Sequence, residues 1–340
     1  MSLITRVLLL ATVFAVTHLN ATEPLDREHS EESDKGFNAN KVILDHVGDS
    51  HEIHLWGEGD TSFSIPLPVI LYTEGDFDIF MSSNFHHGKS NVIKGNREYK
   101  YHHGHIQEVN GKSVIDLSIT KNVVGLLLAS IILIIVFGTM AKSYTKEGIP
   151  KGVSRFLEPF VIFVRDDIAK ANIGEKKYKK FMPYLLTAFF LIWLLNLLGL
   201  LPFGFNVTGN IAFTFVLALF TLILTVFNGN KDYWKHIFAT PGVPSWLSPI
   251  MIPVELIGIL TKPFALMMRL FANITAGHIV ILSLISIIFI MKNVGMAGMS
   301  VPFALFISML ELLVAFLQAF IFTMLSALFI GMAVEEHEHH

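Results

Sequence analysis

The feature that most limits the fold of this chain is a series of apolar runs, each long enough to cross a lipid bilayer. They occupy residues 123–141, 181–205, 207–227, about 253–291, and 301–334. A helix needs about 20 residues to cross, since each residue adds ~1.5 Å against a hydrocarbon core of ~30 Å. The last two runs exceed that length, so they must tilt strongly, bend or fold as hairpins. The runs predict a mostly α, polytopic membrane protein.

The composition agrees with this prediction. Of the 340 residues, 52% are hydrophobic and 16% are charged, which is too apolar for an ordinary soluble domain. The formal net charge of −3 says little about partners because the charges are clustered, and nothing suggests nucleic acid. The chain has no cysteine, which excludes disulfides, a thiol nucleophile and thiolate metal sites.

The first residues are typical of a secretory signal. Arg6 precedes a short apolar run at 7–16, and small residues follow at Ala15 and Ala21. Such a run is too short to span a bilayer. We expect residues 1–21 to be a cleaved signal peptide, which would place the mature N-terminus outside the cytoplasm.

Residues 22–121 are different in kind from the rest of the chain. They are polar and interrupted by glycine, with short alternating stretches such as "HEIHLW", "SFSIPL" and "VIDLSI". This pattern favours several short strands joined by turns. We predict a small β-rich extracytoplasmic domain at 22–121 and a membrane domain at 122–340.

The distribution of lysine and arginine predicts the orientation of the membrane domain. The loop 142–180 carries ten such residues: Lys142, Lys146, Lys151, Arg155, Arg165, Lys170, Lys176, Lys177, Lys179 and Lys180. Lys231 and Lys235 mark a second basic loop, whereas the turn 203–209 has none. By the positive-inside rule both basic loops are cytoplasmic. Five crossings result, with the N-terminus outside and the C-terminus inside.

The first basic loop contains the stretch "EPFVIFVRDDIAK" at 158–170. Phe160, Phe163 and Ile168 fall on one helical face, whereas Arg165 and Asp166 lie largely opposite. This pattern predicts an amphipathic helix in the cytoplasmic interface of the membrane. A plain soluble loop helix is the alternative.

Polar side chains inside the last two runs carry the most information, because an ionisable group at the bilayer centre costs about 2.5–3.5 kcal/mol. They are Glu255, Lys262, Arg269, Asn273 and His278 in the run 253–291, and Glu311 and Gln318 in the last run. Arg269 is always charged and has no acid within one turn of its own helix. Two roles are open for Arg269: a structural role with backbone carbonyls as partners, or pairing with a group on another chain. Lys262 is close enough to the cytoplasmic end to snorkel.

Helical phase separates these residues into two groups. At about 100° per residue, Asn273 and Glu255 each fall about 40° from Arg269, with Glu255 ~21 Å along the axis. His278 falls about 180° from Arg269 and therefore faces another direction. Glu311 and Gln318, on the next helix, lie within about 20° of one face.

Antiparallel docking of the two helices sets which residues share a level. It brings Gln318 near the level of Arg269 and Glu311 near that of His278, on the outer side. An imidazole beside a carboxylate can relay protons. Alternatively, His278 and Glu311 form a static pair that fixes helix packing, and Asn273 and Gln318 make ordinary interhelical hydrogen bonds.

Two stretches resemble a known family. "EL..LTKPFALMMRLFANITAGHIV" and "LELLVAFLQAFIFTMLSALFI" resemble the stator subunit a of F-type ATP synthases, as do "NLLGLLPF" and the ending "AVEEH". The resemblance covers roughly residues 120–338. The β-rich part is similar to an extracytoplasmic extension of some bacterial members. The resemblance implies an interfacial helix, two long tilted helices against a rotor ring, and a bacterial inner-membrane location.

The resemblance also implies roles for single residues. Arg269 matches the essential stator arginine that faces the carboxylates of the rotor ring. Asn273 and Gln318 match polar residues close to it, and Glu255 matches a carboxylate of the cytoplasmic half-channel. His278 and Glu311 match the pair in the opposite half-channel.

One departure from the family concerns that pair. Many relatives have its carboxylate on the fifth segment and its imidazole on the sixth, and here the two are exchanged, which favours a working pair. Asn196 and Asn210 match positions that line the same path. Gly199 falls where some relatives carry an acid.

The implied function is ion translocation without catalytic chemistry, cofactor or metal, with subunit c of the rotor ring, the peripheral-stalk subunit b and membrane lipid as partners. The sequence leaves open whether the ion is H⁺ or Na⁺, since the rotor's site decides that.

The alternative function is that of a secondary transporter whose Arg269 binds an anionic substrate, although no internal repeat supports it. An intramembrane hydrolase is disfavoured because H-E-x-x-H and G-x-S-x-G are absent. In the outer domain, His86, His87 and the stretch 101–105 are a candidate transition-metal site, but neighbouring histidines in a polar loop are more often solvated, and we favour that alternative.

Overall fold

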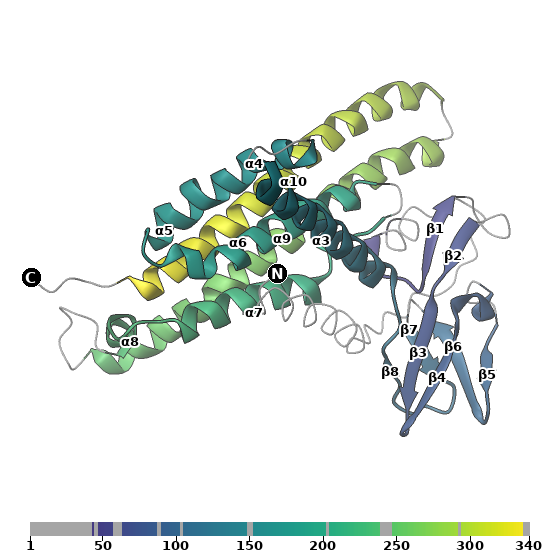
Figure 1. Cartoon of the computed structure of the whole chain (residues 1–340). Helices are drawn as coiled ribbons and strands as arrows, with labels where there is room; N and C mark the ends of the chain where they lie inside the picture. Colours follow the sequence, from purple (N-terminus) through teal and green to yellow (C-terminus); the bar gives the residue numbers. More distant parts are fainter. Residues whose placement is uncertain are drawn as a thin grey trace, which may run out of the picture.

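The computed structural model describes residues 43, 47–56, 63–86, 90–102, 105–147, 152–201, 204–238, 247–291 and 294–335. These form a helical body and a β-domain that lies beside the start of the first long helix (Figure 1). The expected signal peptide at 1–21 and the terminal histidines lie outside the described residues.

The β-domain confirms the prediction of short strands in the N-terminal part. Its strands are β1 (Glu52–Trp56), β2 (Phe63–Pro66), β3 (Pro68–Thr73), β4 (Asp76–Met81), β5 (Val92–Lys94), β6 (Arg97–His102), β7 (His105–Glu108) and β8 (Ile115–Asp116), with a 3₁₀ turn η2 (Ser82–Phe85). They form three antiparallel sheets, in the orders β1-β2, β4-β3-β8 and β5-β6-β7. A cluster that includes Val69, Leu71, Phe80, Tyr99 and Ile106 lies between the last two sheets and forms the core of the domain.

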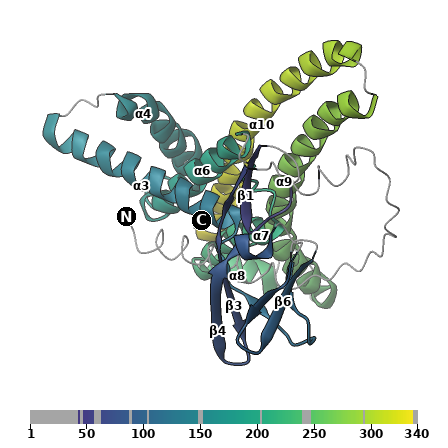
Figure 2. The same cartoon turned by 90° about the vertical axis from the view of Figure 1, so that its right-hand side faces the viewer.

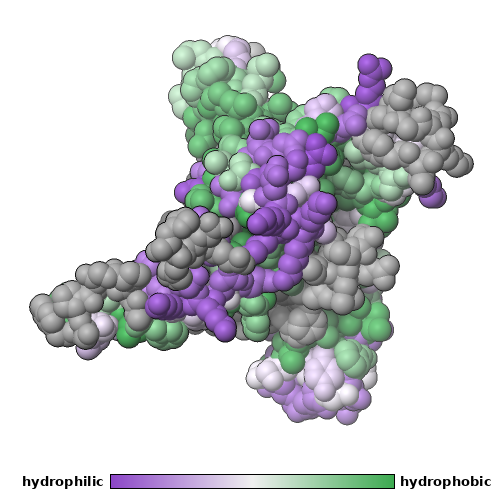
Figure 3. All heavy atoms as spheres, turned by 60° about the vertical axis from the view of Figure 1, so that its left-hand side comes forward, coloured by the Kyte–Doolittle hydropathy of each residue, from purple (hydrophilic) through white to green (hydrophobic). Residues whose placement is uncertain are grey.

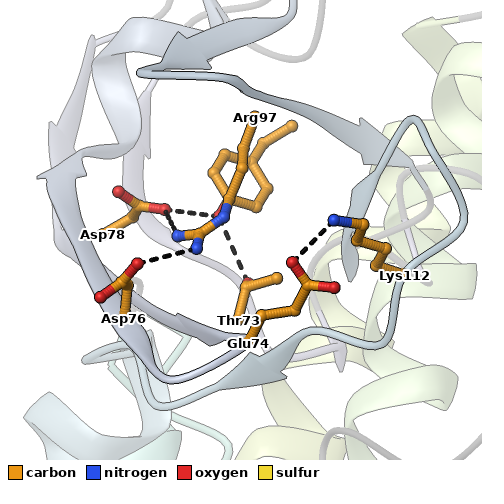
Figure 4. Close-up of polar contacts among 7 residues, drawn as sticks. Thr73, Glu74, Asp76, Asp78, Arg97 and Lys112 are labelled. Carbon is orange, nitrogen blue, oxygen red and sulfur yellow. Dashed lines mark hydrogen bonds and ion pairs between the residues drawn. The ribbon is translucent and has the colours of Figure 1, made fainter.

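A charged group ties these two sheets together at one edge of the core (Figure 4). The guanidinium of Arg97 donates to Asp78 and to Asp76, each at 3.0 Å. The hydroxyl of Tyr99 donates to Asp78 at 2.6 Å. The hydrogen bond to Asp78, opposed by desolvation and reinforced by Asp76, raises the pKa of Arg97 above its usual range. The link fixes β6 against β4.

The β-domain joins the helical body without a flexible linker. The backbone N–H of Lys121 donates to Ser50 at 2.8 Å, and that of Asn122 donates to the side chain of Asp49 at 3.1 Å. These two N–H groups open the first long helix, where no helical partner exists for them. Because atoms of the loop directly before β1 satisfy them, the domain is held directly on the helix end.

Within the described residues, the helical body consists of nine segments. They are α3 (Lys121–Glu147), α4 (Val153–Phe163), the π-helix η3 (Val164–Lys170), α5 (Ala171–Ile173), α6 (Tyr178–Gly199), α7 (Ile211–Phe227), α8 (Lys231–Phe238), α9 (Ser248–Met291) and α10 (Val294–Val334). Of these, α3, α6, α9 and α10 are each long and apolar enough to span a membrane. The segments α7 and α8 meet that standard only as a pair, bent by 99° at a short break.

The two longest helices answer one question that the sequence left open. α9 has 44 residues and α10 has 41, and each is a single helix rather than a hairpin. At ~1.5 Å per residue, α9 is ~66 Å long, about twice the hydrocarbon core. The two helices lie side by side over much of their length (Figures 1 and 2). The run 181–205 behaves differently from the prediction, because its helix ends at Gly199 and an irregular turn follows.

The expected amphipathic helix at 158–170 lies within the continuous helical stretch from α4 to α5. It packs against the body through Phe160, which meets Trp193 of α6 at 4.9 Å between ring centroids, and Phe163, which meets Phe320 of α10 at 5.5 Å. Val164 and Ile168 are buried, whereas Arg165 is exposed. The predicted polar and apolar faces are therefore present, and the apolar face packs against α6 and α10.

The helix ends gather into two groups that lie at opposite ends of the body. Lys177 at the start of α6 donates to the carbonyl of Val334 on α10 at 2.7 Å, and Asn230 beside α7 donates to the same carbonyl at 2.7 Å. Figure 3 shows hydrophilic residues gathered in a band across this face, with hydrophobic surface on either side. At the other end, Asn206 in the α6–α7 turn donates to the carbonyl of Val47 beside the β-domain at 3.1 Å.

Candidate functional site

Arg269 lies on an exposed face of α9. Neighbouring residues Leu266, Met267 and Leu270 are buried, while Arg269 and Asn273 are exposed. Within the described part of the chain, no acidic side chain forms an ion pair with Arg269. The guanidinium therefore has no counter-ion among these residues, although it lies within a helix apolar enough to span a membrane.

Glu255 belongs to the same helix, closer to its N-terminus. It is half-buried, in contrast to Arg269 and Asn273. The shared stripe predicted for these three residues thus runs along a face that is largely open. A partner that packed on this face would contact Arg269, and it would contact Glu255 closer to the N-terminus of α9.

His278 lies on another side of α9 and faces α10. Its Nδ1 atom is 3.7 Å from Oε1 of Glu311, and the two side chains are 13% and 4% exposed. Both carboxylate oxygens of Glu311 are buried with no hydrogen-bond partner among the described residues. The predicted meeting of these residues is confirmed, and the carboxylate has free capacity to bind a proton or a polar ligand.

Gly277 makes room for this carboxylate, which the sequence reading did not anticipate. A Cβ atom at position 277 would lie 2.6 Å from Oε1 of Glu311 and 3.0 Å from its carboxyl carbon. Real Cβ contacts are never that short, so any larger residue would displace Glu311. The only signal in the sequence is a small residue directly before the histidine.

The end of α6 completes this cluster from a third helix. A Cβ atom at Gly199 would lie 3.5 Å from Nε2 of His278, an ordinary contact distance. Position 199 therefore faces the imidazole, and an acid there would reach it. In this chain Glu311 supplies the acid from α10 instead.

Asn196 lies one turn earlier on α6 and is also buried. Its amide donates to the carbonyl of Ala315 at 3.2 Å, and its side-chain oxygen is buried without a partner among the described residues. Asn210 has a clear structural task as the N-cap of α7, where its side-chain oxygen accepts from the N–H of Ala212 at 2.9 Å. Asn196 thus keeps a side-chain oxygen that can accept a hydrogen bond, whereas the side-chain oxygen of Asn210 is used in the N-cap.

Gln318 is buried on α10, whereas Lys262 is half-buried on α9. Gln318 is 6% exposed, on the same buried side of α10 as Glu311. Within the described contacts, no hydrogen bond joins Gln318 to the exposed Arg269. The ammonium of Lys262 lies 5.5 Å from the ring centroid of Phe329 on α10, so this lysine has a partner within the protein.

A buried hydroxyl cluster was also missed by sequence reasoning. Tyr184 of α6 and Thr221 of α7 share a hydrogen bond of 2.6 Å, and Thr221 meets Ser326 of α10 at 3.1 Å. Isolated hydroxyl residues in apolar helices are the only sequence signal for it. The cluster joins three helices, which keeps α6 and α7 aligned with α10.

The outer histidines do not form a metal centre within the described residues, where no group of three His, Asp or Glu has metal-binding geometry. His86 has a left-handed backbone, at φ 45°, and ends the turn η2. His87 and His103 lie outside the described residues.

Comparison with known families divides the chain at the junction between the β-domain and α3. Residues 123–331 match the family described as ATP synthase A chain. Residues 42–124 match a separate family, described only as a domain of unknown function. The boundary between the two matches falls at the start of α3.

Individual relatives match mainly the helical body. The chain is 50% identical over 234 residues to ATP synthase subunit a 2 of Chlorobaculum tepidum, covering 66% of each protein. It is 53% identical over 234 residues to ATP synthase subunit a of Chlorobium phaeobacteroides, covering 66% of this chain and 68% of that protein. With ATP synthase subunit a of Chloroherpeton thalassium, identity is 49% over 240 residues, or 68% of this chain and 70% of the relative.

Proposed function

Since the chain belongs to the ATP synthase A chain family, as a multi-pass membrane protein with an N-terminal extension, we propose that it is the proton-translocating stator subunit of an F-type ATP synthase. In this proposal it forms two offset half-channels beside a rotor ring of subunit c. The peripheral-stalk subunit b holds it against rotation. The complex lies in a bacterial inner membrane.

The proposed topology has five crossings, in which α7 counts as one. The lysine-rich end, where α6 begins and α10 ends, is cytoplasmic by the positive-inside rule. The β-domain then lies outside, because it contacts the opposite helix ends. The domains of the mature protein are the extracytoplasmic part at 22–121 and the membrane part at 122–340, after a signal peptide at 1–21.

The observation that carries the proposal is the exposed Arg269 without an acidic partner among the described residues. Leaving a guanidinium unpaired in lipid is costly. A partner that brings a carboxylate to this face removes that cost. A rotor ring supplies such carboxylates one after another.

Arg269 acts by changing the charge state of each carboxylate that passes it. A carboxylate that faces lipid must be neutral, since an unpaired buried charge is prohibitive. Opposite a guanidinium its ionised form is favoured, so it releases its proton. Arg269 therefore admits only ionised carboxylates and blocks a direct leak between the two half-channels, with Asn273 and Gln318 as nearby polar residues.

The half-channels reach the ring on two sides of this charge. Protons arrive from outside through the cluster of His278 and Glu311, with Asn196 and Asn210 along the path, and load a carboxylate. After the ring has turned, they leave toward the cytoplasm near Glu255. Each elementary charge that crosses gains about 2.3 kcal/mol per 100 mV, so several per turn drive synthesis elsewhere in the complex.

Purification tests this proposal against the alternative of a secondary transporter. A tagged chain extracted in mild detergent is expected to bring with it a ring of small subunits that carry a mid-membrane carboxylate. A transporter would instead be isolated alone or as copies of itself. Isolation without a ring, from membranes that contain the assembled synthase, would contradict the proposal.

A further inference from the structure

The β-domain carries an apolar face that the proposed ion path does not use. It lies on the outer side of the sheet β4-β3-β8, away from the core of the domain. Phe77, Ile79 and Met81 of β4 and Ile115 of β8 are exposed, by 61%, 63%, 43% and 39%. Ile70 and Tyr72 of β3 are half-buried beside them. We call these six residues the outer apolar face.

The strand register makes this face continuous. Ile70 pairs with Ile79, and Tyr72 pairs with both Phe77 and Ile115. The rings of Tyr72 and Phe77 are 4.9 Å apart between centroids. Since side chains alternate across a strand, all six point to one side. Contiguous apolar surface of this kind on a small domain indicates an interaction site.

The opposite outer surface, on sheet β5-β6-β7, has a different composition. Glu98, Lys100, His105 and Gln107 lie there, with Ile93 and Val109 as exposed apolar residues on either side of Glu98. One side of the sandwich is therefore suited to water and the other is not. This difference shows that the apolar face is not a general property of the domain's surface.

The outer apolar face continues into the membrane part of the chain. After Ile115, the alternate residues Leu117 and Ile119 are half-buried, and Ile119 packs against the core of the helical body. The N–H groups of Leu117 and Ile119 donate to the carbonyls of Ile70 and Pro68, at 2.9 and 3.2 Å. The strand thus leads directly into α3, whose own outward side exposes apolar residues such as Ile131.

The direction of the face agrees with this continuity. In Figure 2, β3 and β4 lie on the side of the domain toward which α3 runs, whereas β6 lies on the other side. The hydrogen bonds from Lys121 to Ser50 and from Asn122 to Asp49 hold the domain on the helix end in this orientation. When α3 enters the bilayer, this attachment therefore keeps the outer apolar face turned toward the bilayer.

We propose that the outer apolar face rests on the lipid surface beside the point where α3 enters the membrane. The face presents aliphatic and aromatic side chains, without a charged residue among its six members, and it is joined to a lipid-facing helix. Aromatic and aliphatic groups of this kind enter the boundary between headgroups and acyl chains. The proposal requires only a membrane-embedded chain and does not depend on the ion path.

Site-directed spin labelling tests the proposal, because the chain contains no cysteine. Phe77→Cys and Ile79→Cys place a nitroxide label on the outer apolar face. Ile93→Cys, on the opposite sheet and 71% exposed, is the matched control. Each variant is labelled in the full chain with its co-purifying subunits and reconstituted into vesicles of phosphatidylethanolamine and phosphatidylglycerol. The wild-type chain in the same complex gives the background from other subunits.

Collisions of each label with molecular oxygen, which concentrates in lipid, and with a water-soluble nickel chelate are then compared. We expect the oxygen-to-nickel ratio at positions 77 and 79 to be several-fold higher than at position 93. Equal ratios at all three positions would overturn the proposal. Labels at 77 and 79 that are shielded from both reagents would also overturn it, because another protein would then cover the face.

Discussion

The Nδ1 atom of His278 on α9 lies 3.7 Å from Oε1 of Glu311 on α10, and nothing else among the described residues bonds to that carboxylate. An imidazole and a carboxylate at this distance can exchange a proton directly or through one water. Arg269 lies on another side of the same helix, exposed to whatever packs there. In the proposed stator, the proton path at His278 and the fixed charge of Arg269 would therefore be separated by the body of α9.

Gly277→Ala tests whether the position of Glu311 matters. The added Cβ would lie 2.6 Å from Oε1, so the carboxylate must leave its present position beside His278. We expect ATP-driven proton pumping by reconstituted complexes to fall by about tenfold or more, as misplacement by ~1 Å can cost that much. Gly138→Ala is the control, since a Cβ at that position of α3 meets nothing within 4 Å and lies on another helix. Equal activity of both variants would show that the position of Glu311 set by Gly277 does not matter for pumping.

Exchanging the two residues tests whether they act as a unit. His278→Ala and Glu311→Ala should each abolish most proton transport. The double variant His278→Glu with Glu311→His keeps one acid and one imidazole at the same contact, so it should retain more transport than either single variant. The measurement is quenching of a pH-sensitive dye in vesicles. Two harmless single variants would rule out a relay.

The β-domain should lose stability in acid through Asp116. Burial opposes ionisation of this carboxyl, but hydrogen bonds from His51 at 2.8 Å and from Ser118 outweigh it and hold the pKa below its usual range. A depressed pKa contributes stability above the unfolded value, and this is lost as pH falls through the folded value. The protection of the domain's amides against hydrogen exchange, after correction for the intrinsic pH dependence of exchange, should therefore fall below about pH 4.

Asp116→Asn should weaken that acid dependence, because the amide does not titrate. Glu74→Gln is the control, since Glu74 pairs with Lys112 in an exposed ion pair, away from Asp116. The two variants are compared by the ratio of their protection factors at neutral and acid pH, in which the intrinsic exchange rate cancels. If Asp116→Asn leaves this ratio as it is in the wild-type chain, the assignment to Asp116 is wrong.

Tyr184→Phe should separate stability from transport. The change removes the hydroxyl that bonds to Thr221 inside the body, at a cost of about 1 kcal/mol. The variant is expected to unfold at lower temperature in detergent and to pump at the normal rate once assembled. A large loss of pumping at normal stability would place the hydroxyl cluster on the ion path.

Much of the helical body follows from the sequence because the bilayer limits the possible structures. Apolar length alone predicted that α9 and α10 exceed one bilayer. Helical phase predicted that His278 turns away from Arg269, and antiparallel docking of the two helices predicted that Glu311 lies near its level. These quantities depend only on the rise and rotation of an α-helix. The β-rich character of the outer part also followed from the alternation of residues 51–56 and 115–119.

Other features depend on contacts between distant segments and could not be predicted in this way. The clearance at Gly277 exists only because Glu311 arrives from another helix. The π-helix η3 and the early end of α6 at Gly199 are set by packing and by the following turn. The outer apolar face requires the pairing of β3 with β4 and β8, which alternation alone does not specify.

The charge of Arg269 tests the central proposal most directly. Reconstituted complexes that carry Arg269→Ala or Arg269→Lys are compared with wild type for ATP-driven proton pumping, after the amount of assembled ring has been matched. We expect no coupled pumping in the alanine variant, and none in the lysine variant if the planar guanidinium matters. Pumping at the wild-type rate by the assembled alanine variant would contradict the proposed role of Arg269.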